Sequence, residues 1–425
     1  MNRTSKCRKK LGFILALLIV VLSFSPPVRQ VSEIPGNLTL LKGEAEKLEL
    51  NYPLTLEVQG EDDSLLFDKE SMKIKPLELG EISLEFKLFG YIPLRKVDVE
   101  IVSPVKLIPS GKSVGIKLSS SDTMVVGFHK IETNMGTLSP GKEAGLEKGD
   151  AILEIEGKKA GNVEKAAEIL SKFTEEKSEI NMLIDREGKE KEIKVEPGRC
   201  LEEDEYYAGL FIKDTRAGVG TLTYIDPEED RFGALGHSIS EVGVDKPIEI
   251  NNGEIVTSNI LGIRKGERNE PGEKRGTFID SNGSLGTIDK NTEFGIFGDN
   301  NLDLDEEKLY YDEAIPVGMV QHVEEGRAEI LTVIEGQKVE SFDIEIRRVM
   351  PQNYDSNKGM AIEVTDPELL DKTGGIVQGM SGSPIIQNGK LVGTVTHVFM
   401  NNPQKGYAAY MEWMLHESGE IDNYQ

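Results

Sequence analysis

Cysteine, histidine and aromatic residues are scarce in this chain of 425 residues. It has two cysteines, five histidines, a single tryptophan and 6% aromatic residues. Two cysteines cannot form a disulfide framework, and neither C-x-x-C nor H-E-x-x-H spacing occurs, so the sequence predicts no metal site and no cofactor. Basic residues are also few, because 49 Lys and Arg face 74 Asp and Glu, for a net charge of −25. Nucleic-acid binding needs clustered Lys and Arg, so a nucleic-acid partner is not expected.

An uncharged apolar stretch, Leu11–Phe24, follows a basic segment that contains Arg3, Lys6, Arg8, Lys9 and Lys10. Its length suits a signal-peptide core and is short of the roughly 20 residues that a spanning helix prefers. We interpret residues 1–28 as a cytoplasmic basic tip followed by a membrane anchor, with cleavage as a signal peptide left open. The body of the chain is then expected outside the cytoplasm, attached to the membrane by this segment.

Three regions follow the anchor. Residues 30–104 alternate apolar and polar residues with period two between Gly-containing breaks, which predicts a small β-sandwich-like module. Residues 105–198 combine strand patterns with an amphipathic helix capped by Asn162, as in an α+β domain. Residues 206–425 are rich in strand patterns and glycine and have little helical pattern.

The second region contains the phrase SPGKEAGLEKGDAILEIEGKKA at residues 139–160. This phrase and its order of elements resemble the PDZ domain of bacterial envelope proteases. The resemblance implies that Ser113, Val114, Gly115 and Ile116 form a carboxylate-binding loop, beside which a peptide would add as a strand next to the amphipathic helix. The alternative is that Gly115 is only a turn glycine.

Ser381 lies in the glycine-rich segment GGIVQGMSGSP, and two apolar strands separated by a turn follow it. Chymotrypsin-like peptidases present their nucleophile in such a segment. The glycines allow a sharp turn, so that the amides of Gly379 and Ser381 can point at the oxygen of an attacked carbonyl and form an oxyanion hole. The alternative is a serine in an ordinary glycine-rich hairpin.

A serine nucleophile needs a base within hydrogen-bond reach. His237, in the glycine-rich turn GALGHSIS, is the candidate. The other histidines fit less well, because they fall in the PDZ-like region, in apparent strands or in a terminal helix: His129, His322, His397 and His416. His397 is expected along the strand where substrate pairs in this fold, or alternatively in core packing.

Asp366 is the candidate for the acidic member of a triad. Asp366 precedes Pro367 and Glu368, which is also a complete helix N-cap pattern. The rival carboxylates are Asp280, Asp299 and Asp343.

The chain as a whole resembles the stage IV sporulation protein B peptidase family of endospore-forming bacteria. The resemblance rests on the order of anchor, PDZ-like region and C-terminal domain, and on the motifs GALGHSIS, EVTDPELL and GMSGSPIIQNGKLVGTVTHV. It places the family's His, Asp and Ser on His237, Asp366 and Ser381. It implies a serine endopeptidase that is secreted from the forespore into the intermembrane space, and cleaves itself and then the regulator of an intramembrane metalloprotease, so that a late sigma factor is activated.

The predicted fold is mainly β and multidomain, with a β-sandwich-like module, a PDZ-like domain at 105–198 and a chymotrypsin-like double β-barrel at 206–425. A non-catalytic, membrane-tethered PDZ adaptor with a degenerate peptidase domain is the alternative function. Envelope proteases of the stress-response type usually carry the peptidase before the PDZ domain, and here it follows.

Overall fold

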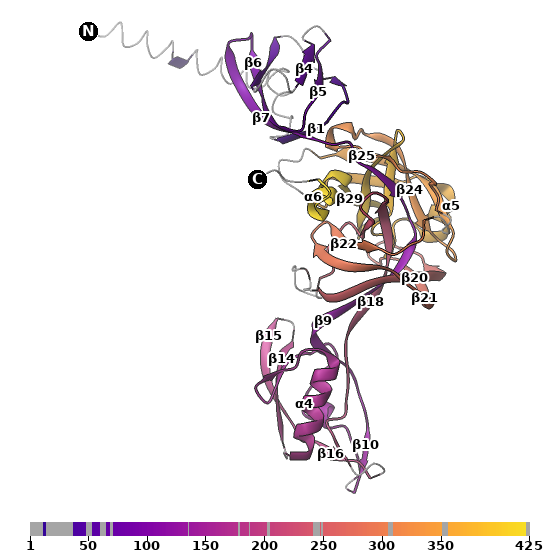
Figure 1. The fold of residues 1–425 in the computed structure, drawn as a ribbon. Helices are drawn as coiled ribbons and strands as arrows, with labels where there is room; N and C mark the ends of the chain where they lie inside the picture. Colours follow the sequence, from indigo (N-terminus) through magenta and orange to yellow (C-terminus); the bar gives the residue numbers. More distant parts are fainter. Residues whose placement is uncertain are drawn as a thin grey trace, which may run out of the picture.

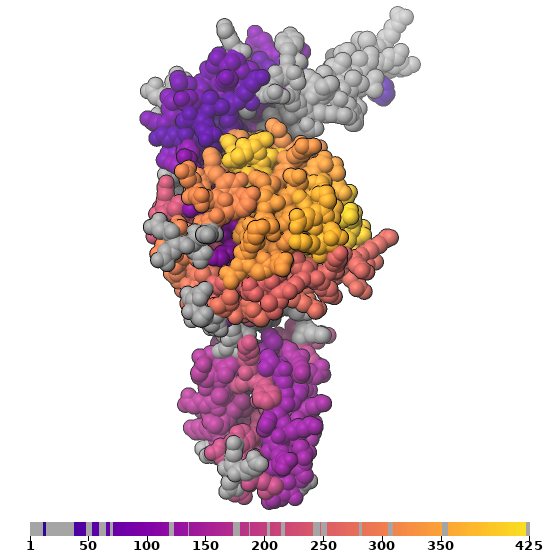
Figure 2. Space-filling model, turned by 90° about the vertical axis from the view of Figure 1, so that its right-hand side faces the viewer, coloured from indigo at the N-terminus to yellow at the C-terminus, as the bar shows by residue number. Residues whose placement is uncertain are grey.

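The structure, a computed structural model, describes residues 12–13, 37–47, 53–59, 65–68, 71–134, 136–176, 179–186, 188–201, 205–240, 247, 250–304, 309–350 and 356–421. Three bodies follow one another in space: an N-terminal β module, a central double barrel and a distal α+β unit (Figure 1). Figure 2 shows the surface of the same three bodies, with a constriction between the double barrel and the distal unit. The mainly β fold predicted from the sequence is confirmed.

The N-terminal module consists of two small sheets. Strands β1 (Asn37–Leu41), β7 (Ile92–Val102), β6 (Gly80–Leu88) and β3 (Leu54–Gln59) form one sheet in that order, and β2 (Glu46–Lys47), β5 (Lys73–Pro76) and β4 (Leu65–Asp68) form the other. Alternate side chains, including Leu84, Phe86 and Val97, fill a core between the sheets. The period-two pattern of the sequence therefore corresponds to one buried and one exposed face.

The first barrel is a ring of six strands that closes on itself. Its order is β9 (Ser113–Phe128), β20 (Ile250–Arg264), β21 (Glu273–Thr292), β22 (Gly295–Asn300), β19 (Arg231–Ala234) and β18 (Leu210–Asp226), and β18 pairs back onto β9. Two short strands, β8 (Lys106–Pro109) and β23 (Ile315–Pro316), extend the ring beyond β18. Apolar side chains such as Val114, Leu222 and Phe232 fill its interior.

The distal α+β unit is inserted into this ring between β9 and β18. Its elements are β10 (Ile131–Thr133), β11 (Gly136–Leu138), α3 (Pro140–Glu143), β12 (Ala151–Ile155), β13 (Lys158–Lys159), α4 (Val163–Glu176), β14 (Ile180–Arg186), β15 (Lys189–Val195), β16 (Gly198–Arg199) and β17 (Tyr206–Tyr207). The far end of β9 joins β12, β14 and β15 in one sheet, and the first residues of β18 pair with that end of β9 beside α4. The two long strands thus connect both bodies (Figure 1).

The location of Ser113–Ile116 differs from the prediction. These residues begin β9 inside the first barrel, where they pair with β20 on one edge and β18 on the other. Ser113 and Val114 are buried, and a side chain on Gly115 would collide with the Phe278 ring. Both edges of the strand are occupied, so its amides cannot receive a peptide carboxylate, and the peptidase fold already begins before the predicted boundary at residue 206.

The second barrel is closed in the order β24 (Gly326–Val333), β25 (Val339–Val349), β26 (Met360–Val364), β29 (Asn402–Tyr410), β28 (Lys390–Phe399) and β27 (Pro384–Gln387). Helix α5 (Pro367–Thr373) follows β26, α6 (Met411–Ser418) follows β29, and the short 3-10 helix η1 (Val320–His322) leads into the barrel. Ile330, Val395 and Tyr410 lie in its fully buried core.

The predicted membrane segment, Leu11–Phe24, lies outside the described residues except for Gly12 and Phe13. Within the part of the chain that the structure describes, no helix has the length and apolarity needed to span a bilayer.

Candidate active site

A cleft of about 710 Å³ is lined by both barrels. Ile116 and Leu118 of β9 and His237, from the turn after β19, contribute from the first barrel, and Ser381 and His397 contribute from the second. The predicted base and nucleophile therefore face one cavity. Most of the other lining side chains are apolar, and none of the described lining residues carries a carboxylate. Such a lining suits an uncharged substrate side chain.

The loop Gln378–Ser383 presents Ser381 between two glycines in the left-handed region, Gly379 (φ +94°) and Gly382 (φ +95°). Four of its six amides donate to protein carbonyls: Gln378 to Gly272, Met380 to Val377, Gly382 to Val395, and Ser383 to Met380. The amides of Gly379 and Ser381 have no acceptor among the described residues. They are the two that the sequence assigned to the oxyanion hole, which requires neighbouring amides without a protein acceptor.

The Ser381 hydroxyl is half-buried and donates to the Thr396 carbonyl at 3.0 Å. This bond fixes Oγ at the floor of the cleft in the resting enzyme. Rotation about χ1 is the motion that would bring Oγ from the carbonyl toward the base, as catalytic hydrogen bonds often form only with substrate present.

The turn that carries His237 lies tightly against the second barrel. Leu235 adopts φ +72°, a conformation that non-glycine residues rarely hold and that is often found at functional sites. The next residue, Gly236, has φ +69°, and a Cβ there would lie 2.5 Å from Cγ2 of Thr394 and 3.1 Å from Cγ2 of Thr396. Glycine at this position lets the base approach the strand that also contacts Ser381.

The protonation state of His237 follows from its surroundings. Its Nδ1 lies 2.8 Å from the Ser238 carbonyl oxygen. Because a carbonyl only accepts, Nδ1 carries the proton and Nε2 keeps its lone pair. Burial lowers the pKa of His237 below its usual value, and the bond to the Ser238 carbonyl partly opposes this shift. The imidazole is thus a neutral base at neutral pH.

A second imidazole, that of His397, packs on His237 with 5.3 Å between ring centroids and 40° between planes. Burial, followed by the charges of His237 and Lys358, lowers the pKa of His397 to about 4, so this ring is also neutral at neutral pH. Its Nδ1 is buried without a hydrogen-bond partner among the described residues. The sequence placed His397 near the substrate strand, and the structure places it in the cleft wall.

Asp366 is not brought to His237. Its carboxylate caps α5 and accepts from the amides of Glu368 at 2.9 Å and Leu369 at 3.0 Å. Within the described part of the chain, no carboxylate forms a hydrogen bond or ion pair with His237. Of the rivals, Asp299 pairs with Arg231 and Asp343 is exposed, whereas the Asp280 side chain lies outside the described residues.

Thr221 of β18 supports the nucleophile loop and was not anticipated from the sequence. It is fully buried, its amide donates to the Ser381 carbonyl at 3.0 Å, and its hydroxyl donates to the Gly379 carbonyl at 2.7 Å. A Cβ on Gly382 would lie 2.0 Å from the Thr221 carbonyl oxygen. In the sequence, Thr221 is one of several threonines in an alternating strand, with no signal that marks it.

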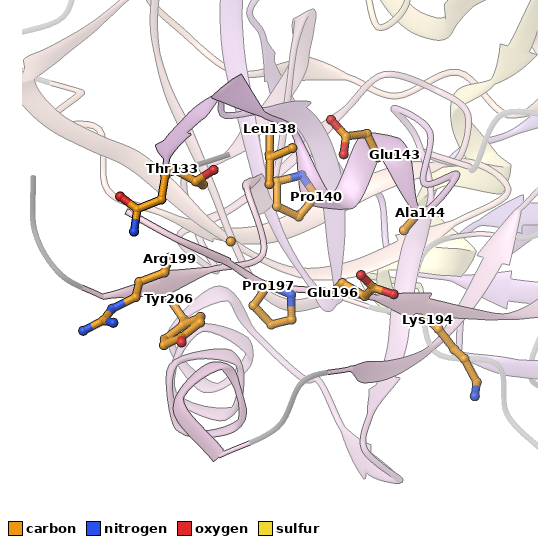
Figure 3. Close-up of a pocket in the computed structure, with 12 residues that line it drawn as sticks. Thr133, Leu138, Pro140, Glu143, Ala144, Lys194, Glu196, Pro197, Arg199 and Tyr206 are labelled. Carbon is orange, nitrogen blue, oxygen red and sulfur yellow. The ribbon is translucent and has the colours of Figure 1, made fainter. Parts of the chain in front are cut away.

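The inserted α+β unit has a separate cavity of about 800 Å³ between α3, the β10–β11 hairpin and β15 to β17 (Figure 3). Glu143 and Lys194 give its lining both charges, and the Arg199 guanidinium lies 5.9 Å from the centre of the Tyr206 ring. Ser113–Ile116 are not part of this lining. Peptide binding by this unit stays a prediction. Its candidate location is now this cavity and no longer Ser113–Ile116.

Two regions of the chain match known protein families. Residues 114–196 match the PDZ domain, and residues 204–415 match the family of SpoIVB peptidase S55. No match was found among curated protein sequences. Two solved structures are similar at low identity: the Rv3671c protease from M. tuberculosis in its active form (14% identity, 49% of this chain and 76% of that one, TM-score 0.28) and its inactive form (15%, 48% and 84%, TM-score 0.27). On the family match, the chain is a serine peptidase that belongs to the SpoIVB peptidase S55 family.

Proposed function

We propose that this protein is an endopeptidase that cleaves itself and then a membrane-associated regulator in sporulation signalling, and so activates a late sigma factor. The observation that carries the peptidase chemistry is that His237 and Ser381 line one cleft beside two amides that have no acceptor among the described residues. The regulator, the self-cleavage and the sigma factor rest on the family resemblance.

The proposed reaction begins with rotation of the Ser381 hydroxyl away from the Thr396 carbonyl. Nε2 of His237 takes the hydroxyl proton as Oγ attacks the substrate carbonyl, and the amides of Gly379 and Ser381 hold the oxyanion. His237 then gives the proton to the leaving amine, and the C–N bond breaks to leave an ester on Ser381. Water, deprotonated by His237, attacks this ester; the bond between Oγ and the acyl carbon breaks, the acid product leaves, and His237 returns the proton to Oγ.

The Ser238 carbonyl orients His237 in the resting site through Nδ1. The family resemblance assigns an orienting role to Asp366, whose carboxylate here caps α5. We therefore assign base and nucleophile to His237 and Ser381, and leave Asp366 to the experiment described below.

The N-terminal segment is proposed to hold the protein at the membrane with its body outside the cytoplasm, which by the family resemblance is the space between the two forespore membranes. The PDZ-like unit is proposed to bind a chain end or partner and so position the peptidase. Its location supports this role, because the unit projects from the double barrel on two strands (Figure 1).

The test is self-cleavage of the full-length chain in mild detergent, with wild type beside Ser381→Ala and His237→Ala. We expect fragments only from wild type, since loss of the nucleophile typically reduces the rate by about 10⁶. Intact masses of the fragments give the cleavage site. Equal fragmentation of wild type and Ser381→Ala would refute the assignment of the nucleophile, and labelling of Ser381 by a fluorophosphonate shows whether an uncleaved wild type holds an active site.

A further inference from the structure

Lys274 lies directly beneath the nucleophile loop. Its amide donates to the Gln378 carbonyl at 2.9 Å, and the adjacent Glu273 bridges Gln378 in a parallel β-bridge. A Cβ built on Gly379 would lie 3.1 to 3.3 Å from three methylene carbons of Lys274. The lysine stem therefore forms the surface on which the Gly379 peptide rests.

The amino group of Lys274 has two hydroxyl partners and no carboxylate partner among the described residues. Its Nζ donates to the Thr332 hydroxyl at 2.8 Å and to the Ser113 hydroxyl at 3.2 Å, and only 2% of the residue is exposed. No described carboxylate lies within ion-pair distance of it. Burial lowers the pKa of Lys274 to about 7.

The three polar groups come from both barrels. Lys274 lies on β21 and Ser113 on β9 of the first barrel, and Thr332 lies on β24 of the second. Burying an ammonium without a carboxylate is unfavourable for folding, and such groups concentrate at functional sites. The side chain that links the two barrels thus packs against Gly379, which carries one of the two amides of the proposed oxyanion hole.

We propose that Lys274 is a positioning residue for catalysis: through its stem under Gly379 and its amino group between Thr332 and Ser113, it fixes the Gly379 amide of the oxyanion hole. The proposal rests on the function proposed above. Its consequence is that loss of the amino group lets the Gln378–Gly379 peptide shift, so the transition state loses stabilisation while substrate contacts elsewhere in the cleft remain.

The test variant is Lys274→Met in the full-length chain, which keeps most of the methylene stem and removes the amino group with its two hydrogen bonds. The matched control is Lys338→Met, because Lys338 is an exposed lysine paired with Glu340. The assay is the rate of Ser381 labelling by a fluorophosphonate at increasing probe concentration, whose phosphonyl oxygen occupies the oxyanion hole. It separates the limiting rate from the half-saturating concentration, and self-cleavage is followed in parallel.

For Lys274→Met we expect the limiting rate and self-cleavage to fall by about 10- to 100-fold, the loss that roughly 1 Å of misplacement causes. The half-saturating concentration and the final extent of labelling stay as in wild type, and Lys338→Met behaves as wild type. A merely structural role would lower the extent of labelling instead. A limiting rate within about twofold of wild type overturns the proposal, since misplacement of an oxyanion donor costs far more.

If Lys274→Met does not fold, the proposal is tested with Thr332→Val. This variant removes the hydrogen bond from Lys274 Nζ to the Thr332 hydroxyl, the shorter of the two Nζ bonds, at nearly constant side-chain volume. It is expected to slow labelling in the same way, and an unchanged rate overturns the proposal. Ser381→Ala distinguishes failure of the proposed peptidase function from failure of the proposed role of Lys274. Persistent cleavage in Ser381→Ala refutes the proposed function, whereas its inactivity together with full activity of Lys274→Met refutes only the role of Lys274.

Discussion

The buried ammonium of Lys274 leads to a quantitative prediction for stability. Its folded-state pKa of about 7 lies below the ordinary value of 10.5. Between these values the unfolded chain binds one proton more than the native protein, so stability rises with pH across this window. From pH 7.5 to 9.5 the two pKa values give a gain of about 2.5 kcal/mol, and Lys274→Met removes this dependence.

The assay is urea unfolding followed by fluorescence of the single tryptophan, Trp413, which packs against the core of the second barrel. Both proteins carry Ser381→Ala, so that self-cleavage does not interfere. Other titrating groups are common to both and cancel in the difference between them. If wild type and Lys274→Met gain stability equally between pH 7.5 and 9.5, Lys274 is not a buried, titrating ammonium and the reasoning fails.

Three further predictions concern the cleft and are read by fluorophosphonate labelling of Ser381 unless stated. Gly382→Ala should slow labelling by about 10²-fold or more, because its Cβ would lie 2.0 Å from the Thr221 carbonyl oxygen. The control is Gly389→Ala, which should label normally, because Gly389 has a similar positive φ and no neighbouring atom within 4 Å of a built Cβ. Asp366→Ala should lower the free energy of unfolding by about 1 kcal/mol in urea, and Asp366→Ser should restore it as a substitute cap. Because no contact joins Asp366 to His237, we expect Asp366→Ser to label within about tenfold of wild type; a loss near 10⁴ would instead assign it to a triad. The fall in labelling rate at acid pH should have its midpoint below 6.5, because burial lowers the pKa of His237; a midpoint above 6.5 would indicate a carboxylate partner.

Much of the local structure follows directly from the sequence. The Asn162 cap, the Asp366-Pro367 start of α5 and the terminal helix that contains His416 are all where their patterns predict them. Ser381 between glycines and His237 after a glycine also fall together in one cleft, as the mechanism requires. These features are predictable because each depends on a few neighbouring residues with strict backbone or chemical requirements.

What the sequence could not reveal depends on pairing between distant residues. Lys274 is one lysine among many in a polar segment, and only the closing of two barrels buries it. Asp366 satisfied two patterns at once, a helix cap and a triad member, and local geometry favours the cap because its amide donors are two and three residues away. The segment Ser113–Ile116 matched a PDZ-like pattern, whereas strand pairing with β18 and β20 places it in the barrel.

The position of Ser113–Ile116 in the barrel determines which deletions can separate peptide binding by the PDZ-like unit from peptide cleavage. A deletion of residues 105–198, the boundaries suggested by the sequence, removes β8 and the half of β9 that lines the cleft with Ile116 and Leu118. It would open the ring of the first barrel and remove the Ser113 hydroxyl that holds Lys274. Lost activity in such a variant would therefore say nothing about peptide binding. A deletion confined to the unit between the far ends of β9 and β18 leaves the ring intact, and only that variant can separate the PDZ-like unit from the peptidase.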